Sequence, residues 1–230
     1  MMVGILGSAA VLGTIVLLLV LFLQRGKDGF DPSPRGLLRL YLYIASLAGI
    51  VVLSIGAASV VNYGLARAAG DQLIYGGSPV PPIARPACPP EAAGKGCVEP
   101  TAEELERQRQ AEQQQRERQR NEDLLRGITY ASFGALFWGA HWAARRGLGE
   151  SDASMVALRR GYLMLGTVIF GLATIVLLPT GVYQVLAFFI LATPEGYYRQ
   201  GADALGGGLV VLPVWLVYLR LVVTEFRQTA

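Results

Sequence analysis

Five long apolar stretches, separated by polar segments, dominate the chain and predict five membrane helices. They cover residues 3–23, 37–63, 128–146, 156–192 and 205–223. Crossing the hydrocarbon core of a bilayer takes about 20 consecutive apolar residues, and each stretch is close to this length or longer. We therefore predict an all-α integral membrane protein with five transmembrane helices.

The first stretch, within residues 1–24, is a candidate for either a signal peptide or a retained anchor. A signal peptide has a basic start, an apolar core of about 7–15 residues and a small-residue cleavage site. No Lys or Arg precedes Arg25, and the apolar run is longer than such a core. We predict an N-terminal transmembrane anchor, and then a cytoplasmic turn and the second transmembrane helix within residues 25–63. Because basic residues follow the anchor and none precedes it, the positive-inside rule places the N-terminus outside.

The polar segment of residues 64–127 is predicted to form a large loop on the extracytoplasmic side. Its first part is rich in Pro and Gly and contains Cys88 and Cys97. An oxidising compartment favours a disulfide between two such cysteines, and unpaired thiols are the alternative. Two cysteines without a nearby histidine do not make a structural zinc site, which has four ligands.

The second part of this loop, residues 102–126, contains neither Gly nor Pro and predicts a charged helix. Thr101 and Glu104 form the pattern of an N-terminal capping box. Glu precedes Arg at i,i+4 spacing in the pairs Glu103/Arg107, Glu112/Arg116 and Glu122/Arg126. This helix leads into the third transmembrane helix, residues 128–146. One glycine between them does not stop a helix, so both parts are able to form a single rod.

Residues 147–230 are predicted to contain the fourth and fifth transmembrane helices and a short cytoplasmic tail. The turn before the fourth helix is bracketed by Arg145, Arg146, Arg159 and Arg160, which indicates a cytoplasmic location. Pro179 interrupts the fourth apolar stretch, and that stretch is longer than one crossing requires. We expect either a kink at Pro179 or a second piece along the outer interface.

The second and fourth helices begin alike, which indicates an internal repeat. Arg39-x-Tyr41 matches Arg160-x-Tyr162, and in the helices that return, Trp138 precedes His141 as Trp215 precedes Tyr218, by three positions. The chain after the anchor is therefore predicted to be two similar helical hairpins in parallel orientation. Interfacial preferences of Arg, Tyr and Trp alone are the alternative explanation.

The same positions carry a resemblance to a known family. Leu38 to Tyr43, Arg159 to Met164, and His141-Trp142 with Arg145 and Arg146 resemble the helix starts and helix end of an uncharacterised bacterial multi-pass membrane family. The resemblance covers residues 36–192, and the inserted arm at 76–126 departs from that family's compact loop. It implies a location in the bacterial cytoplasmic membrane and supplies no activity.

Composition agrees with a membrane location and excludes nucleic acid as a partner. The chain is 53% hydrophobic and 16% charged, against about 25% charged in soluble domains. The net charge of +3 is small and comes from residues that flank helices, whereas nucleic-acid binding requires a clustered basic surface.

Two kinds of candidate site follow from the residues near the membrane boundary. His141, the only histidine, is a candidate ligand for haem or a pigment, with an interfacial structural role as the alternative. The remaining candidates are predicted interface anchors and lipid contacts: Arg39, Tyr41, Tyr43, Trp142, Arg145, Arg146, Arg159, Arg160 and Tyr162. No other cofactor and no metal is expected.

No catalytic constellation is found in the sequence, so we predict a protein that is not an enzyme. There is no Ser/His/Asp set, no phosphate-binding Gly-rich loop and no cluster of His, Cys and carboxylates at metal spacing. We predict a non-enzymatic subunit or accessory protein of a larger membrane assembly, which contacts other membrane subunits or itself through the polar helix. A small transporter or channel component is the alternative, although the apolar stretches hold no Asp, Glu or Lys at mid-span.

Overall fold

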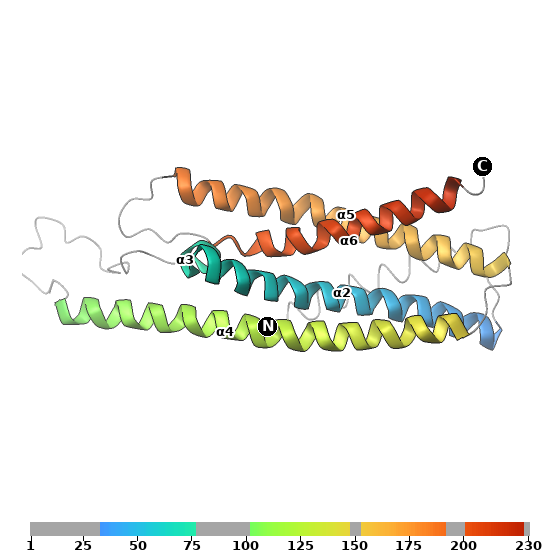
Figure 1. The fold of residues 1–230 in the computed structure, drawn as a ribbon, viewed down its shortest axis with the longest axis horizontal. Coiled ribbons are helices and arrows are strands. Elements are labelled where there is room, and N and C mark those ends of the chain that lie inside the picture. The colour runs from blue at the N-terminus through green and yellow to red at the C-terminus, as the bar shows by residue number, and fades with distance from the viewer. Residues whose placement is uncertain (1–32, 77–101, 148–152, 192–200, 228–230) are drawn as a thin grey trace, which may run out of the picture. The chain divides into compact units, whose positions relative to one another are not determined.

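The computed structural model describes residues 33–76, 102–147, 153–191 and 201–227, and every element in these ranges is helical. Helix α2 covers Pro34–Ala69, α3 Asp71–Tyr75, α4 Ala102–Gly147, α5 Ala153–Ile190 and α6 Asp203–Arg227 (Figure 1). The predicted N-terminal anchor and the predicted disulfide between Cys88 and Cys97 lie outside the described residues.

Three of these helices are long and apolar enough to cross a membrane. They are Pro34–Ala69, Leu158–Ile190 and Asp203–Arg227, the second being most of α5. The predicted third crossing, residues 128–146 at the end of α4, is not among them. Its apolar run is diluted by His141 and ends in two arginines, which lower its hydropathy. Three spans are therefore supported by the described residues.

Helix α4 joins the charged helix and the apolar stretch into one element of 46 residues. Residues 102–126 offer no breaker, and Gly127 lies inside the helix rather than at its end. A Cβ built at Gly127 would approach the Val60 backbone nitrogen to 2.9 Å, so the glycine permits close contact between α4 and α2. The charged helix and the apolar stretch that follows it therefore form one continuous helix, as the sequence allowed.

Helix α5 runs without interruption through Pro179 to Ile190, so the predicted second piece does not form. Beside the proline, the Thr180 hydroxyl donates a hydrogen bond to the Val176 carbonyl at 2.6 Å. Pro179 itself has no N–H to donate to the Ile175 carbonyl, four residues earlier, and proline is tolerated in membrane helices because neighbouring groups and local adjustments compensate for such a lost bond.

The described chain divides into two compact units, each built from parts of the long helices. The first takes its residues from Met1–Leu53, Phe133–Gly171 and Pro213–Ala230. The second takes its residues from Ser54–Ser132 and Leu172–Leu212.

Both units pair α2 with α4 and α5 with α6, as the predicted hairpins require. In the first unit, Gly49 faces the backbone of Trp138, and Gly171 faces the Trp215 indole. In the second unit, Gly56 faces Ala131 and Gly181 faces Leu205. Small residues let membrane helices approach closely, and glycine is used here at each contact.

The second unit also has a small apolar core where α3 packs beneath the start of α6. Ala66, Leu73, Ile74 and Ala202 are all buried in it. The Ala202 backbone nitrogen donates to the Leu73 carbonyl at 2.8 Å, which ties α3 to the residue before α6.

Candidate functional site

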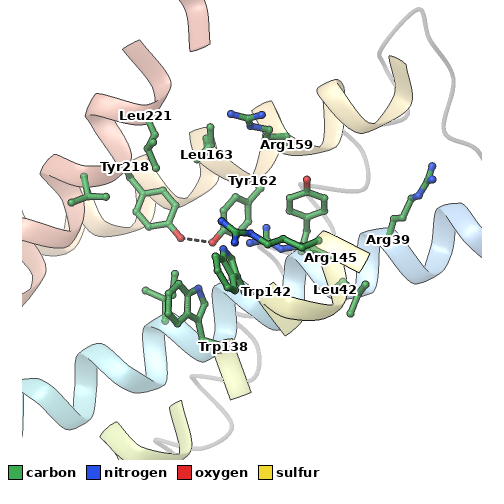
Figure 2. A pocket seen from close by; sticks show the side chains of 14 residues that line it. Arg39, Leu42, Trp138, Trp142, Arg145, Arg159, Tyr162, Leu163, Tyr218 and Leu221 are labelled. Carbon is green, nitrogen blue, oxygen red and sulfur yellow. Dashed lines mark hydrogen bonds between the residues drawn. The ribbon is translucent and has the colours of Figure 1, made fainter. Parts of the chain in front are cut away.

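A cavity of about 330 Å³ lies among the four long helices of the first unit. Its lining combines arginines, aromatic rings and aliphatic side chains: Arg39, Leu42, Tyr43 and Ile50 from α2, Trp138, Trp142, Arg145 and Arg146 from α4, Arg159, Tyr162 and Leu163 from α5, and Val217, Tyr218 and Leu221 from α6 (Figure 2). Most of the residues predicted as interface anchors therefore meet at one place.

Two of the arginines are held in position by aromatic rings. The Arg145 guanidinium carbon lies 4.7 Å from the centre of the Tyr43 ring and 5.1 Å from that of Tyr162. The Arg146 guanidinium carbon lies 3.7 Å from the Trp142 ring. Cation–π contacts of this kind orient a guanidinium without neutralising its charge. Figure 2 shows the Arg145 side chain extending beside Tyr162.

A pair of tyrosines forms the α5–α6 wall of the cavity. The hydroxyl oxygens of Tyr162 and Tyr218 are 2.6 Å apart and share a hydrogen bond, drawn as the dashed line in Figure 2. Tyr218 is 4% exposed. A Cβ at Gly166 would meet the Tyr218 ring, so the absence of a side chain there makes room for the tyrosine.

One carboxylate, Glu225 of α6, fixes the arginine pair at the start of α5. Its Oε2 lies 3.1 Å from a guanidinium nitrogen of Arg159, and its Oε1 lies 4.0 Å from Nε of Arg160. Glu225 itself does not line the cavity. This acidic partner was missed at the level of sequence, although it falls near the end of the predicted fifth helix, opposite the two arginines.

His141 already uses both ring nitrogens within the first unit. Nδ1 is 2.7 Å from the Phe137 carbonyl oxygen, and Nε2 is 3.3 Å from the Tyr41 hydroxyl. Because a carbonyl only accepts, Nδ1 donates to Phe137, and Nε2 shares the second hydrogen bond with the Tyr41 hydroxyl. Haem or pigment ligation by His141 stays a prediction that requires displacement of Tyr41.

One pair of contacts in the first unit falls at the positions that the predicted repeat aligns. Tyr41 contacts His141 in the first hairpin, and Tyr162 contacts Tyr218 in the second. These are the positions that the Arg-x-Tyr match and the tryptophan spacing align. The duplication itself stays a prediction, with interfacial preferences as the alternative.

The cavity wall also contains a donor that is not satisfied. The indole nitrogen of Trp138 is buried and has no hydrogen-bond partner within the described residues. Leaving a buried donor unpaired costs about 1–3 kcal/mol. Trp138 lines the cavity, but neighbouring atoms cover its N–H, so a bound group would reach this donor only after a movement of the indole.

A second polar cluster, in the second unit, holds the charged part of α4. Nη1 of Arg120 contacts both carboxylate oxygens of Asp71, at 3.0 and 3.3 Å. The side chains of Arg120 and Asp71 are 21% and 25% exposed. This ion pair ties the charged helix to α3, close to the buried Leu73 and Ile74.

Beside this pair, burial raises the pKa of the Asp123 carboxyl, although Tyr75 and Arg126 lower it. Asp203 and Glu122 add a further upward contribution through charge repulsion. The Tyr75 hydroxyl is buried close to the Asp123 carboxylate. Burial and the neighbouring Asp123 also raise the pKa of Tyr75, so this tyrosine stays neutral.

Asp123→Asn is therefore expected to stabilise the second unit at neutral pH. A folded-state pKa above the unfolded value means that folding takes up a proton between the two values. The pKa of an Asp carboxyl in the unfolded chain is about 4. The contribution of Asp123 to folding stability is therefore present below this pH and is lost as the pH rises through the raised pKa of the folded state. Between pH 4 and pH 7.5, the Tm of the wild type should fall by more than the Tm of Asp123→Asn. Glu117→Gln, at an exposed position of the same helix whose charge is not among those acting on Asp123, is the control. A lower Tm for Asp123→Asn than for the wild type at pH 7.5 would contradict the prediction.

The charged part of α4 bears two of the three predicted ion pairs. Arg107 contacts Glu103 at 2.6 Å and Arg116 contacts Glu112 at 3.3 Å. Arg126 contacts Asp123 at 3.9 Å instead of the predicted Glu122.

Comparisons with known proteins identify no relative. A scan against protein-family models and searches of curated proteins and solved structures found no match to this chain. The resemblance to the uncharacterised bacterial membrane family therefore stays a prediction.

Proposed function

We propose that the protein is a non-enzymatic accessory subunit of a larger membrane assembly, and that the charged part of α4 is its docking arm. The docking arm is defined as residues 102–126. The proposal rests on a continuous helix that is attached to α3 at one end of the arm, its base, and that exposes one side, called the open face below. The Asp71–Arg120 pair anchors the base, and α4 continues the arm without a break.

The open face of the arm has the chemistry of a protein-binding surface rather than a lipid-binding one. Gln114, Arg118, Asn121 and Leu125 recur at spacings of three and four and are all exposed. Leu125 is 71% exposed, and a shallow groove follows this face. A single aliphatic side chain among amides and charges suits the polar extramembrane face of a partner subunit.

We further propose five crossings of a bacterial cytoplasmic membrane, with the N-terminus and the docking arm outside and the C-terminus in the cytoplasm. The predicted anchor and residues 128–146 supply the two crossings beyond the three supported spans. Phe133 and Leu136 support the second of these, because they are 68% and 71% exposed as lipid-facing side chains would be. The arginines that flank the short turn between α4 and α5 support its cytoplasmic orientation.

The proposal is tested by purification from the native membrane in mild detergent. We expect other subunits to co-purify in fixed stoichiometry with the wild-type chain. Arg118→Ala combined with Leu125→Ala removes the open face and should reduce co-purification about tenfold, as loss of an interface hot spot does.

The matched control is Arg109→Ala with Gln113→Ala, which lies about 180° and 220° around the helix from Arg118. It removes the same charge and should leave co-purification unchanged. Equal loss in both variants would indicate a general effect on the helix. A homogeneous particle of this chain alone would contradict the accessory role.

A further inference from the structure

We propose that the cavity of the first unit binds the phosphate headgroup of an anionic membrane lipid. The site is the Arg- and Trp-lined cavity described above. This inference does not depend on the docking arm, which belongs to the second unit.

Charge is the first argument. Arg39, Arg145, Arg146 and Arg159 line the cavity, and no Asp or Glu does among the residues that the structure describes. In the same ranges, Arg145 and Arg146 stack on rings and form no ion pair. Glu225 already pairs with Arg159, so the charges of Arg145 and Arg146 are the ones that an anion in the cavity would neutralise. The planar guanidinium matches phosphate in geometry, since it donates two parallel hydrogen bonds.

The unsatisfied donor is the second argument, and it is independent of charge. Trp138 lines the same cavity as the two ring-stacked arginines, and its buried N–H is an unsatisfied donor within the described residues. A small movement of the indole would let a phosphate oxygen in the cavity accept from this N–H as well as from the guanidinium groups. Gly49 lies against the backbone of Trp138, which lets α4 approach α2 closely at this position.

The third argument identifies the anion as a lipid rather than a soluble phosphate. The cavity lining also includes Leu42, Ile50 and Leu163, which a free phosphate ion would not use. On one side the lining continues into Val217 and Leu221 of α6, which are 57% and 44% exposed. Helix α6 is one of the three candidate spans, so these side chains lead from the arginines to the surface that faces acyl chains.

Size and depth agree with a headgroup. A volume of about 330 Å³ is near the lower end of small-molecule pockets, which run from about 300 to 1,000 Å³. It accommodates a phosphate, its polar substituent and the first methylene groups, and the remaining acyl chains would extend over α6. Arg, Tyr and Trp together are typical of the headgroup layer, and basic pockets between membrane helices bind anionic lipids.

The test is a lipid titration of the delipidated full-length chain in mild detergent, read by native mass spectrometry. Phosphatidylglycerol and phosphatidylcholine with identical acyl chains are compared, and glycerol 3-phosphate and inorganic phosphate are added as competitors. We expect phosphatidylglycerol to bind about tenfold or more tightly than phosphatidylcholine, as one charge-assisted hydrogen bond provides. The soluble phosphates should compete only weakly.

Two variants and one control assign this preference to the cavity. Arg145→Gln with Arg146→Gln should abolish the preference, and Trp138→Phe, which removes the N–H and keeps a ring, should weaken phosphatidylglycerol binding about tenfold. Arg109→Gln with Arg118→Gln removes the same charge from the docking arm and should bind like the wild type. If the double arginine variant does not elute as a monodisperse particle, Trp138→Phe alone tests whether the lipid preference belongs to the cavity.

Three results would overturn the inference. Equal affinity for the two lipids would exclude recognition of an anionic headgroup. An unchanged preference in both cavity variants would place the lipid elsewhere. Competition by glycerol 3-phosphate or inorganic phosphate at the same concentration as the lipid would show that the ligand is a soluble phosphate compound.

Discussion

Gly134→Ala is expected to destabilise the first unit by about 1–3 kcal/mol, the usual cost of overpacking. A Cβ at this position would lie 2.7 Å from the Leu53 Cα and 3.0 Å from the Gly49 carbonyl oxygen, and would also meet the Leu53 backbone nitrogen. These are backbone atoms, so no side chain is able to rotate away, and the α2–α4 contact must widen. Tryptophan fluorescence during thermal unfolding in detergent measures the resulting fall in Tm.

Gly139→Ala, five residues further along the same helix, is the matched control and should have the opposite sign. Nothing lies within 4 Å of a Cβ built there. Alanine stabilises a helix by up to about 1 kcal/mol relative to glycine when no clash opposes it. Equal effects at the two glycines would contradict the close α2–α4 packing, because helix propensity alone would then explain both.

Asp71→Asn is expected to release the base of the docking arm from α3 at a cost of about 1–3 kcal/mol. The substitution removes the charge partner of Arg120, whose side chain is only 21% exposed and whose Nε is already unpaired in the described residues. The effect should be local, since α3 and the arm are joined here while the glycine contacts of the second unit are retained. Hydrogen exchange over residues 112–124 should therefore accelerate more than exchange in α5.

A double-mutant cycle with Arg120→Gln isolates the energy of the pair. The stability costs of the two single variants should add up to more than the cost of the double variant, because each single variant leaves one partner without the other. The control is the same cycle on Glu103 and Arg107, whose side chains are 74% and 73% exposed. Exposed helical pairs contribute about 0.2–0.5 kcal/mol. A coupling energy of this small size for Asp71 and Arg120 would mean that the ion pair does not hold the arm.

Much of the fold follows from the sequence because the determinants are local. Residues 102–126 lack breakers, so the charged helix and its continuation were predictable from composition. The hairpin pairing followed from the Arg-x-Tyr and Trp spacings, which place equivalent contacts at Tyr41–His141 and Tyr162–Tyr218. At Pro179 the sequence left a kink and a second piece open, because it shows the missing donor but not how the helix continues, and α5 continues through the proline without a second piece.

The site was only partly predictable, because a cavity depends on side chains from several helices. The arginines and tyrosines near the membrane boundary were recognisable one by one. Their convergence was not, since it requires the crossing of α5 and α6 that brings Tyr218 to Tyr162. Leu42, Ile50 and Leu163 carry no signal at all, because aliphatic residues in an apolar helix are indistinguishable from those that face lipid.

The glycine contacts have a mechanical consequence for the first unit. Gly49 and Gly134 bring backbone against backbone, so α2 and α4 are expected to move as one rigid body. The α2–α5 and α4–α5 contacts are of another kind: Tyr43 meets Tyr162 ring to ring, and Arg145 lies over Tyr162. Such side chains slide and change rotamer at low cost, so motion is expected to concentrate between the hairpins. The cavity lies along that boundary, and its occupant would act as a wedge that sets the angle between the two halves.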